Sequence, residues 1–166
     1  EKKDERDFYR DKQRVKIQPE NTSIEDDVMK LCFSKDNEIR HEIYKTLDNS
    51  WLISSSIKDI YNQVNIHLNS DYEPDAKVIL DQLKQLGQDG AHRKLVELVF
   101  EIDKIEPTLD MARDSIARLQ YIYLKNNLES LRLRLKDSEN NFQDPTELIN
   151  QITEIQTQMN SIKGIS

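Results

Sequence analysis

The fold is decided by residues 109–162, which read LDMARDSIARLQYIYLKNNLESLRLRLKDSENNFQDPTELINQITEIQTQMNSI. Apolar residues recur at helical spacing as far as Leu135, and the polar stretch 137–143 then interrupts them. A second helical pattern follows this stretch. We therefore expect one long helix, a short turn and a return helix that folds back along the first, with everything upstream forming a body for this hairpin.

The long helix carries its apolar residues on two faces. On a wheel of about 100° per residue, the two sets lie roughly 120° apart around the helix axis. Heptad drift is only about 20° per seven residues, so supercoiling does not explain the shift. We expect the helix to change its packing partner partway along. The first set comprises Leu109, Ala112, Ile116, Leu119 and Tyr123, and the second comprises Leu124, Leu128, Leu131 and Leu135.

The return helix has a strong start signal and a narrow apolar stripe. Asp144 is predicted as the N-cap, Pro145 as the first helical residue and Glu147 as the acidic residue of the first turn. The stripe, with spacings of four, three, four and three, is typical of an antiparallel two-helix seam. It comprises Leu148, Ile152, Ile155, Met159 and Ile162.

This seam is predicted to hold the return helix only weakly. A fully buried apolar side chain contributes about 1.5 to 3 kcal/mol, whereas ordering the backbone costs about 1 to 2 kcal/mol per residue. Five stripe residues are few for a helix of this length. We therefore expect the return helix to be mobile unless a partner or the body holds it.

Apolar residues outside the seam are candidates for a docking surface. Leu133 faces away from the seam between Arg132 and Arg134, Ile149 lies off the second stripe, and Phe142 lies in the turn. Apolar groups beside arginines are typical of binding surfaces. The alternative interpretation is that Phe142 plugs the open end of the hairpin.

Five shorter helices are predicted upstream of the hairpin. A turn at residues 18–21 precedes the first, which begins at Thr22 or Ser23. Residues 34–37, Ser56 and Pro74 are predicted to begin the next three helices, and the stop at residues 87–90 separates the fourth helix from the fifth. Thr108 is predicted to cap the long helix, and Trp51 to anchor the core.

The chain is therefore expected to be all-α, with a globular bundle of about five short helices joined through a long helix to a C-terminal antiparallel hairpin. We divide it into residues 1–21, a linker or tether, residues 22–123, the bundle, and residues 124–166, the hairpin. Residues 1–16 mix both signs of charge, which favours a tether over a basic arm that touches nucleic acid.

Composition excludes several classes of protein. The net charge of -7 disfavours nonspecific binding to duplex DNA. The sequence has no run of eighteen apolar residues, so it predicts no membrane span. Its charged first residues predict no signal peptide. A single cysteine, Cys32, is consistent with a reducing, cytoplasmic compartment. Because the chain does not begin with Met, we expect it to be a fragment of a longer protein.

No pattern in the sequence predicts catalysis or a cofactor. His41, His67 and His92 lack a second metal ligand at a suitable spacing. The adjacent carboxylates of residues 25–27 are interpreted as complementing the dipole of a helix start. The glycines at 87 and 90 lack the Lys-Ser/Thr of a phosphate loop. We expect no metal, no cofactor and no enzymatic activity from this chain alone.

This arrangement resembles the carboxy-terminal helicase-binding domain of bacterial DNA primase. The residues that carry the resemblance run from residue 22 onward. They are the amphipathic segment 24–33, the Trp51-Leu52 link, the segment 110–116 leading into Leu119, and the terminal Leu148-Ile149, Ile155-Gln156 and Ile162-Lys163 pairs.

The resemblance implies a noncatalytic module that docks on the N-terminal domains of the replicative DNA helicase and regulates primer synthesis. The hairpin would supply much of that contact, with Arg132, Leu133, Arg134, Phe142 and Ile149 as the candidate residues. It also implies that basic residues bind the acidic tail of single-stranded DNA-binding protein. We expect the fragment to be monomeric, with no membrane partner.

Two other interpretations remain open. The N-terminal domain of the replicative helicase is similar in outline, but such a domain continues into an ATPase, whereas residues 162–166 resemble a natural terminus with Gly164 as the helix stop. The third interpretation is a generic adaptor or oligomerisation module that uses residues 148–162 as a coiled coil, although two heptads are few for one.

Overall fold

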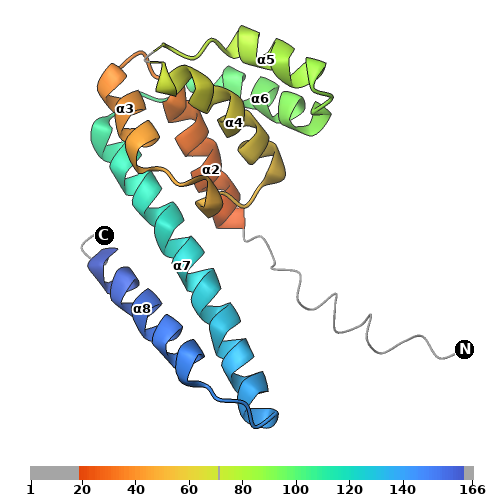
Figure 1. The fold of residues 1–166 in the computed structure, drawn as a ribbon. Helices are drawn as coiled ribbons and strands as arrows, with labels where there is room; N and C mark the ends of the chain where they lie inside the picture. The colour runs from red at the N-terminus through yellow and green to blue at the C-terminus, as the bar shows by residue number, and fades with distance from the viewer. Residues whose placement is uncertain (1–18, 71, 163–166) are drawn as a thin grey trace, which may run out of the picture.

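The structure, a computed structural model, describes residues 19–70 and 72–162, with side chains from residue 24 onward. Over this part of the chain it contains seven α-helices, one 3-10 helix and no strands, which confirms the predicted all-α class (Figure 1). The elements are α2 (Pro19–Cys32), α3 (Asn37–Thr46), η1 (Asn49–Trp51), α4 (Ser55–Asn69), α5 (Ala76–Gln85), α6 (Asp89–Ile102), α7 (Leu109–Asn140) and α8 (Thr146–Ile162). Residues 1–18 of the predicted tether and the predicted stop at Gly164 lie outside the described residues.

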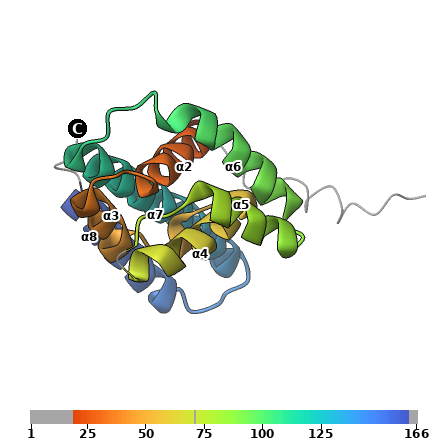
Figure 2. The same ribbon diagram turned by 90° about the horizontal axis from the view of Figure 1, so that it is seen from above.

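Helix α2 is the centre of the body. It packs against α3, α4, α6 and α7, and Figure 2 shows it between α3 and α6. Its inward face buries Val28, Met29 and Cys32 completely, and Leu31 almost so. Such burial in the interior of a small domain contributes about 1.5 to 3 kcal/mol per large side chain. The five short helices therefore share one core, and Trp51 packs against it from η1 as predicted.

Helix α2 begins earlier than the sequence predicted. The proposed turn at 18–21 is wrong from Pro19 onward, because α2 starts at that proline. Proline is tolerated in the first turn of a helix, where its missing N–H has no partner to lose and its fixed φ suits the helix. The domain boundary drawn at residue 22 therefore falls inside α2.

Side chains cap most of the helices that follow. Asp36 accepts a hydrogen bond from Glu38 N at the start of α3, and Thr108 caps α7 as predicted. The starts of α4 and α5 are displaced from the predicted ones. Ser54 caps α4 in place of Ser56, and Asp75 caps α5, so Pro74 lies outside the helix. A run of hydroxyls or a Pro-Asp pair offers several capping residues, and packing selects among them.

Helix α7 joins the body to the hairpin and, as predicted, changes partner along its length. Its 32 residues extend over about 48 Å at 1.5 Å per residue. Ala112, Ile116 and Leu119 belong to the body's core, where α7 packs on α2 and α3. Leu124 and Leu128 are also buried but lie outside that core, on the half that faces α8. The division therefore falls between Leu119 and Leu124.

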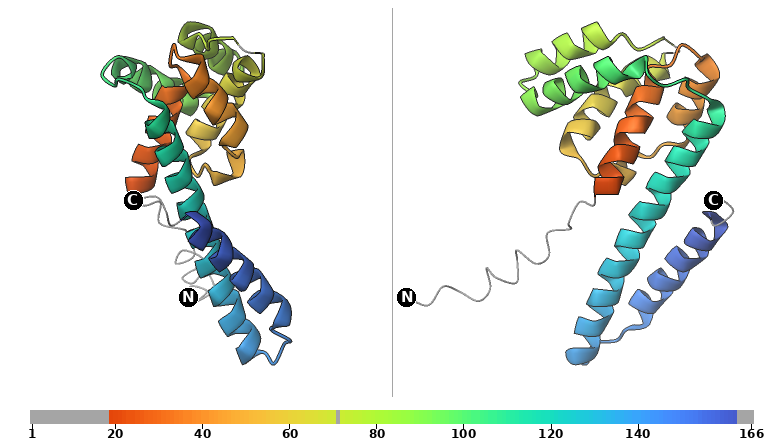
Figure 3. Two further views of the ribbon diagram at one scale, coloured as in Figure 1. Left: turned by 90° about the vertical axis from the view of Figure 1, so that its left-hand side faces the viewer. Right: turned by 180° about the vertical axis from the view of Figure 1, so that it is seen from behind.

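Helix α8 is held by one neighbour. It packs along α7, and the two helices project from the body as an arm (Figure 3). Within Thr146–Ile162 no side chain is fully buried, and the predicted stripe residues are all half-buried. The arm is thus a two-helix layer with a thin apolar seam, whereas the body is a multilayered core.

This difference predicts unequal hydrogen exchange. Opening of α8 breaks contacts with α7 alone, whereas opening of α4 disrupts a core that includes Ile57, Ile60 and Val64. We expect amide protection in α8 to be at least about tenfold lower than in α4, equivalent to about 1.4 kcal/mol. Exchange mass spectrometry measures this, with the surface helix α5 as a control because it retains the buried Ile79 and Leu83. Equal protection in α8 and α4 would contradict the marginal seam.

Candidate interaction arm

The predicted docking residues all lie on the arm and are all exposed. Arg132, Leu133 and Arg134 lie on α7, Ile149 lies on α8, and Phe142 lies in the turn between them. Arg132, Leu133 and Arg134 do not pack in the seam between α7 and α8. The arm therefore presents these groups to solvent.

The helical pitch explains why Leu133 is exposed. Successive residues point about 100° apart, so residues 131 and 133 cannot share a face. The side chain of Leu131 is 8% exposed in the seam, whereas that of Leu133 is 61% exposed. An isolated exposed leucine is common. Its place on a protruding arm, between two exposed arginines, makes it a candidate contact.

The turn at the tip of the arm has a specific backbone structure. The N–H of Phe142 donates to the carbonyl of Glu139 at 3.3 Å, and the N–H of Gln143 donates to that of Ser138 at 3.0 Å. These two bonds form a Schellman motif, in which the residue after the C-cap adopts the left-handed conformation. Glycine usually occupies that position. Here it is Phe142, with φ of 54°.

Phe142 does not plug the hairpin. Its side chain is 97% exposed, so the interpretation of Phe142 as a plug is wrong. The physical reason is the left-handed backbone, which turns this residue out of the seam at the point where the chain reverses. A bulky residue in this conformation costs about 1 kcal/mol or more. The turn therefore displays an aromatic side chain at a cost in stability.

The start of α8 is well capped. The carboxylate of Asp144 accepts hydrogen bonds from the hydroxyl of Thr146 at 2.6 Å and from its backbone N–H at 3.0 Å. These donors lower the pKa of the Asp144 carboxyl below its ordinary value. The helix begins at Thr146, one residue after the predicted start at Pro145. Asp144 is thus a structural residue of the tip and remains ionised at neutral pH.

The charges of the arm are segregated, a pattern that the docking prediction missed. Residues 125–136 of α7 carry four basic groups and one acidic group, whereas residues 137–147 carry four acidic groups and no basic one. The basic groups are Lys125, Arg132, Arg134 and Lys136, and the acidic groups of the tip are Asp137, Glu139, Asp144 and Glu147. All eight are exposed, and none forms an ion pair with another described residue. Counting charge along the sequence could have found this pattern.

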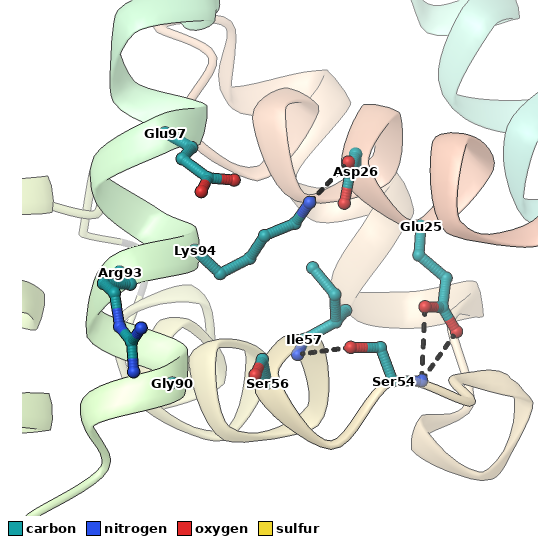
Figure 4. Close-up of a pocket in the computed structure, with 9 residues that line it drawn as sticks. All are labelled: Glu25, Asp26, Ser54, Ser56, Ile57, Gly90, Arg93, Lys94 and Glu97. Atoms are coloured by element: carbon teal, nitrogen blue, oxygen red, sulfur yellow. Dashed lines mark hydrogen bonds and ion pairs between the residues drawn. The ribbon is translucent and has the colours of Figure 1, made fainter. Parts of the chain in front are cut away.

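The body contains a second feature, an open pocket of about 300 Å³ where α2, α4 and α6 meet (Figure 4). The ammonium of Lys94 on α6 lies 2.8 Å from Oδ2 of Asp26 on α2. Oδ1 of Asp26 is buried without a partner among the described residues, a group that one water molecule can satisfy. The exposed Arg93 and Glu97 complete the charged rim.

Glu25 gives this pocket a structural role. Its buried carboxylate accepts hydrogen bonds from the backbone N–H groups of Ile53 and Ser54, so it fixes the link that leads into α4. Burial raises the pKa of Glu25 above its ordinary value, although these two hydrogen bonds oppose the shift. The prediction that residues 25–27 complement a helix dipole is wrong, because α2 starts at Pro19 and places all three beyond the first turn.

The described part of the chain contains no group of three or more His, Cys, Asp or Glu side chains able to hold a metal ion. Cys32 is buried in the core, which raises the pKa of its thiol and makes it an apolar packing group. Among the described helices, none is both long enough and apolar enough to cross a bilayer.

No protein-family model matches the chain, and comparisons with curated proteins and with solved structures give no match. The fold and the arm are therefore the basis of the functional argument.

Glu25 yields a prediction about pH and stability. Because its folded-state pKa is raised, its contribution to stability is fully present below the unfolded value near 4.5 and is lost as pH rises through the folded value. We therefore expect the free energy of unfolding of the native protein, minus that of Glu25→Gln, to be more positive at pH 4 than at pH 7. Urea unfolding of both proteins at the two pH values measures this, and comparison with Gln removes the contribution of other carboxylates. A difference that is constant or grows with pH would contradict the assignment.

Glu25→Ala tests the structural role directly. The substitution leaves the N–H groups of Ile53 and Ser54 without their acceptor, and the free energy of unfolding should fall by about 2 to 3 kcal/mol. Glu97→Ala, on the exposed rim of the same pocket, should change it by less than about 0.5 kcal/mol.

Proposed function

We propose that this chain is a protein-interaction domain of a bacterial DNA primase, without catalytic activity of its own, that docks on the N-terminal region of the replicative DNA helicase. In this role it recruits primase to the replication fork and regulates primer synthesis. The observation that carries the proposal is the arm, in which α7 is the main neighbour of α8 among the described helices, and which exposes Leu133, Phe142 and Ile149.

The element order supports the proposal. Five short helices, a long helix and a return helix are the elements that the resemblance to the helicase-binding domain implies, and all of them occur in the described chain. A binding arm needs a rigid base and accessible side chains. The body's core supplies the base, because Ala112, Ile116 and Leu119 anchor the first half of α7 in it.

The composition of α8 argues against a coiled coil with a second copy of the chain. Its single apolar stripe already faces α7, and its exposed residues are mostly Asn, Gln, Thr, Ser and Glu. A second seam would need a second apolar stripe. We therefore favour a monomer that binds a different protein.

Leu133→Glu should weaken binding to the N-terminal region of a bacterial replicative helicase by at least about tenfold, or 1.4 kcal/mol, because it places a charge where an apolar contact is needed. Isothermal titration calorimetry measures the affinity, and circular dichroism should show unchanged helicity. The matched control is Ile66→Glu on α4, since Ile66 is equally exposed, at 61%. Equal affinities for the native chain and Leu133→Glu would contradict the arm as the dock.

Deletion of residues 144–166 should abolish the same binding. Because the deletion also uncovers the leucines of the α7 seam, the point variant remains the decisive measurement. Sedimentation should show a monomer; a stable dimer would favour an oligomerisation module. Binding to the helicase-binding domain of a primase, in place of the helicase, would favour the interpretation of this chain as the helicase's own N-terminal domain.

A further inference from the structure

The tip of the arm combines backbone strain, an exposed aromatic side chain and clustered like charges. Phe142 has a left-handed backbone at a position that glycine would occupy without strain. Its side chain is 97% exposed and buries almost nothing. The surrounding residues 137–147 carry four acidic groups and no basic one. Asp144 and Glu147 serve the start of α8, but folding does not explain the strain and exposure of Phe142 or the charges of Asp137 and Glu139 at the C-terminal end of α7.

Strain retained at an exposed position is typical of a binding site. The Schellman bonds from Phe142 and Gln143 fix the backbone, so the direction of the Cα–Cβ bond of Phe142 is set before a partner arrives. A preorganised aromatic residue loses little conformational entropy on binding. Phenylalanine has no polar atom on its ring, so the group that receives it is an apolar pocket.

The charges around Phe142 define the rim of that pocket. Asp137 and Glu139 on α7 and Asp144 and Glu147 beyond the turn are all exposed. Acidic residues on both sides of an apolar anchor in the sequence are complementary to basic side chains on the partner, since acidic side chains on the partner would repel them. Residues 125–136 of α7, here called the shaft, have the opposite sign, and Arg134 lies about 9 Å before the end of α7 at Asn140, at 1.5 Å per residue.

The basic residues of the shaft also reduce the stability of the free chain. Arg132 and Lys136 are four residues apart on one helix face, where like charges are destabilising. Neither forms an ion pair with a described residue. The two zones of the arm thus offer opposite charges to a partner and leave both unneutralised in the free chain.

We infer that the arm docks tip first: Phe142 enters an apolar pocket with a basic rim on the partner, while Arg134 contacts carboxylates that lie further along the shaft, about 9 Å before α7 ends at Asn140. The inference rests on the proposed function for the identity of the partner. It adds the anchor residue, the chemistry of the receiving surface and the direction of docking, because a reversed arm would bring like charges together.

The experiment separates anchoring from folding by using a variant that should stabilise the chain. Phe142→Gly removes the side chain and also relieves the left-handed strain, so the melting temperature should stay constant or rise by about 2 to 4 °C. Affinity for the helicase N-terminal region should nevertheless fall at least about tenfold. Phe100→Ala on α6 is the matched control, since Phe100 is 75% exposed on the body, and its affinity should be unchanged.

Charge reversal tests the two zones. Glu139→Lys at the tip and Arg134→Glu on the shaft should each weaken binding about threefold or more, whereas Asp81→Lys on the exposed face of α5 should not change it. A photoreactive phenylalanine analogue at position 142 should cross-link to partner peptides that contain apolar residues together with Lys or Arg. The same analogue at position 100 should give no product.

Each outcome decides between the proposals. If the native chain binds and Phe142→Gly binds equally well, the tip is not the anchor and the inference is wrong while the proposed function stands. If the charge reversals have no effect, the direction of docking is wrong. If Phe100→Ala weakens binding as much as Phe142→Gly, the arm is not the specific contact. If the native chain does not bind the helicase region at all, the proposed function is wrong and the inference falls with it.

Discussion

The structure depends on one constraint, which is that α7 must bury two apolar faces against two different partners. Its first half completes the core around α2, and its second half has no body to pack against. Leu124, Leu128 and Leu131 would be exposed to water without α8. The return helix α8 covers these leucines, and the length of α7 sets the distance of the tip from the body.

This constraint also explains why the arm and the body differ in stability. The body has a hub, α2, that is buried by four helices and tied to α6 by Lys94–Asp26 and by Lys30–Glu101 at 3.0 Å. The arm has two layers, so the stripe residues of α8 stay half-buried even though Leu124, Leu128 and Leu131 of α7 are buried. A two-helix layer with one half-buried stripe gains less from burial per ordered residue than a core does. The arm is therefore the part of the chain whose stability a bound partner can most increase.

Much of this arrangement could be predicted from the sequence, because helical periodicity reports which face of each helix is buried. The two faces of α7, the stripe of α8 and the exposure of Leu133 follow from spacing alone. The cap at Ser54 could not be chosen over Ser56, since both hydroxyls have suitable spacing. Glu25 was misread because its partners, Ile53 and Ser54, are about 28 residues away along the chain. The left-handed backbone of Phe142 was also inaccessible, since glycine or asparagine is the residue that signals it.

Binding at the exposed tip and closure of the weak α7–α8 seam are thermodynamically linked. A partner that binds residues on both α7 and the turn restrains the ends of the connection between α7 and α8, so its binding free energy also favours the closed hairpin. Linkage makes this effect reciprocal: whatever stabilises the closed arm increases the fraction of chains ready to bind. The strain at Phe142 opposes closure in the free chain and persists in the complex, where contacts of the ring can offset it. An arm of marginal stability with a preset aromatic tip is therefore suited to binding that is specific and readily reversed.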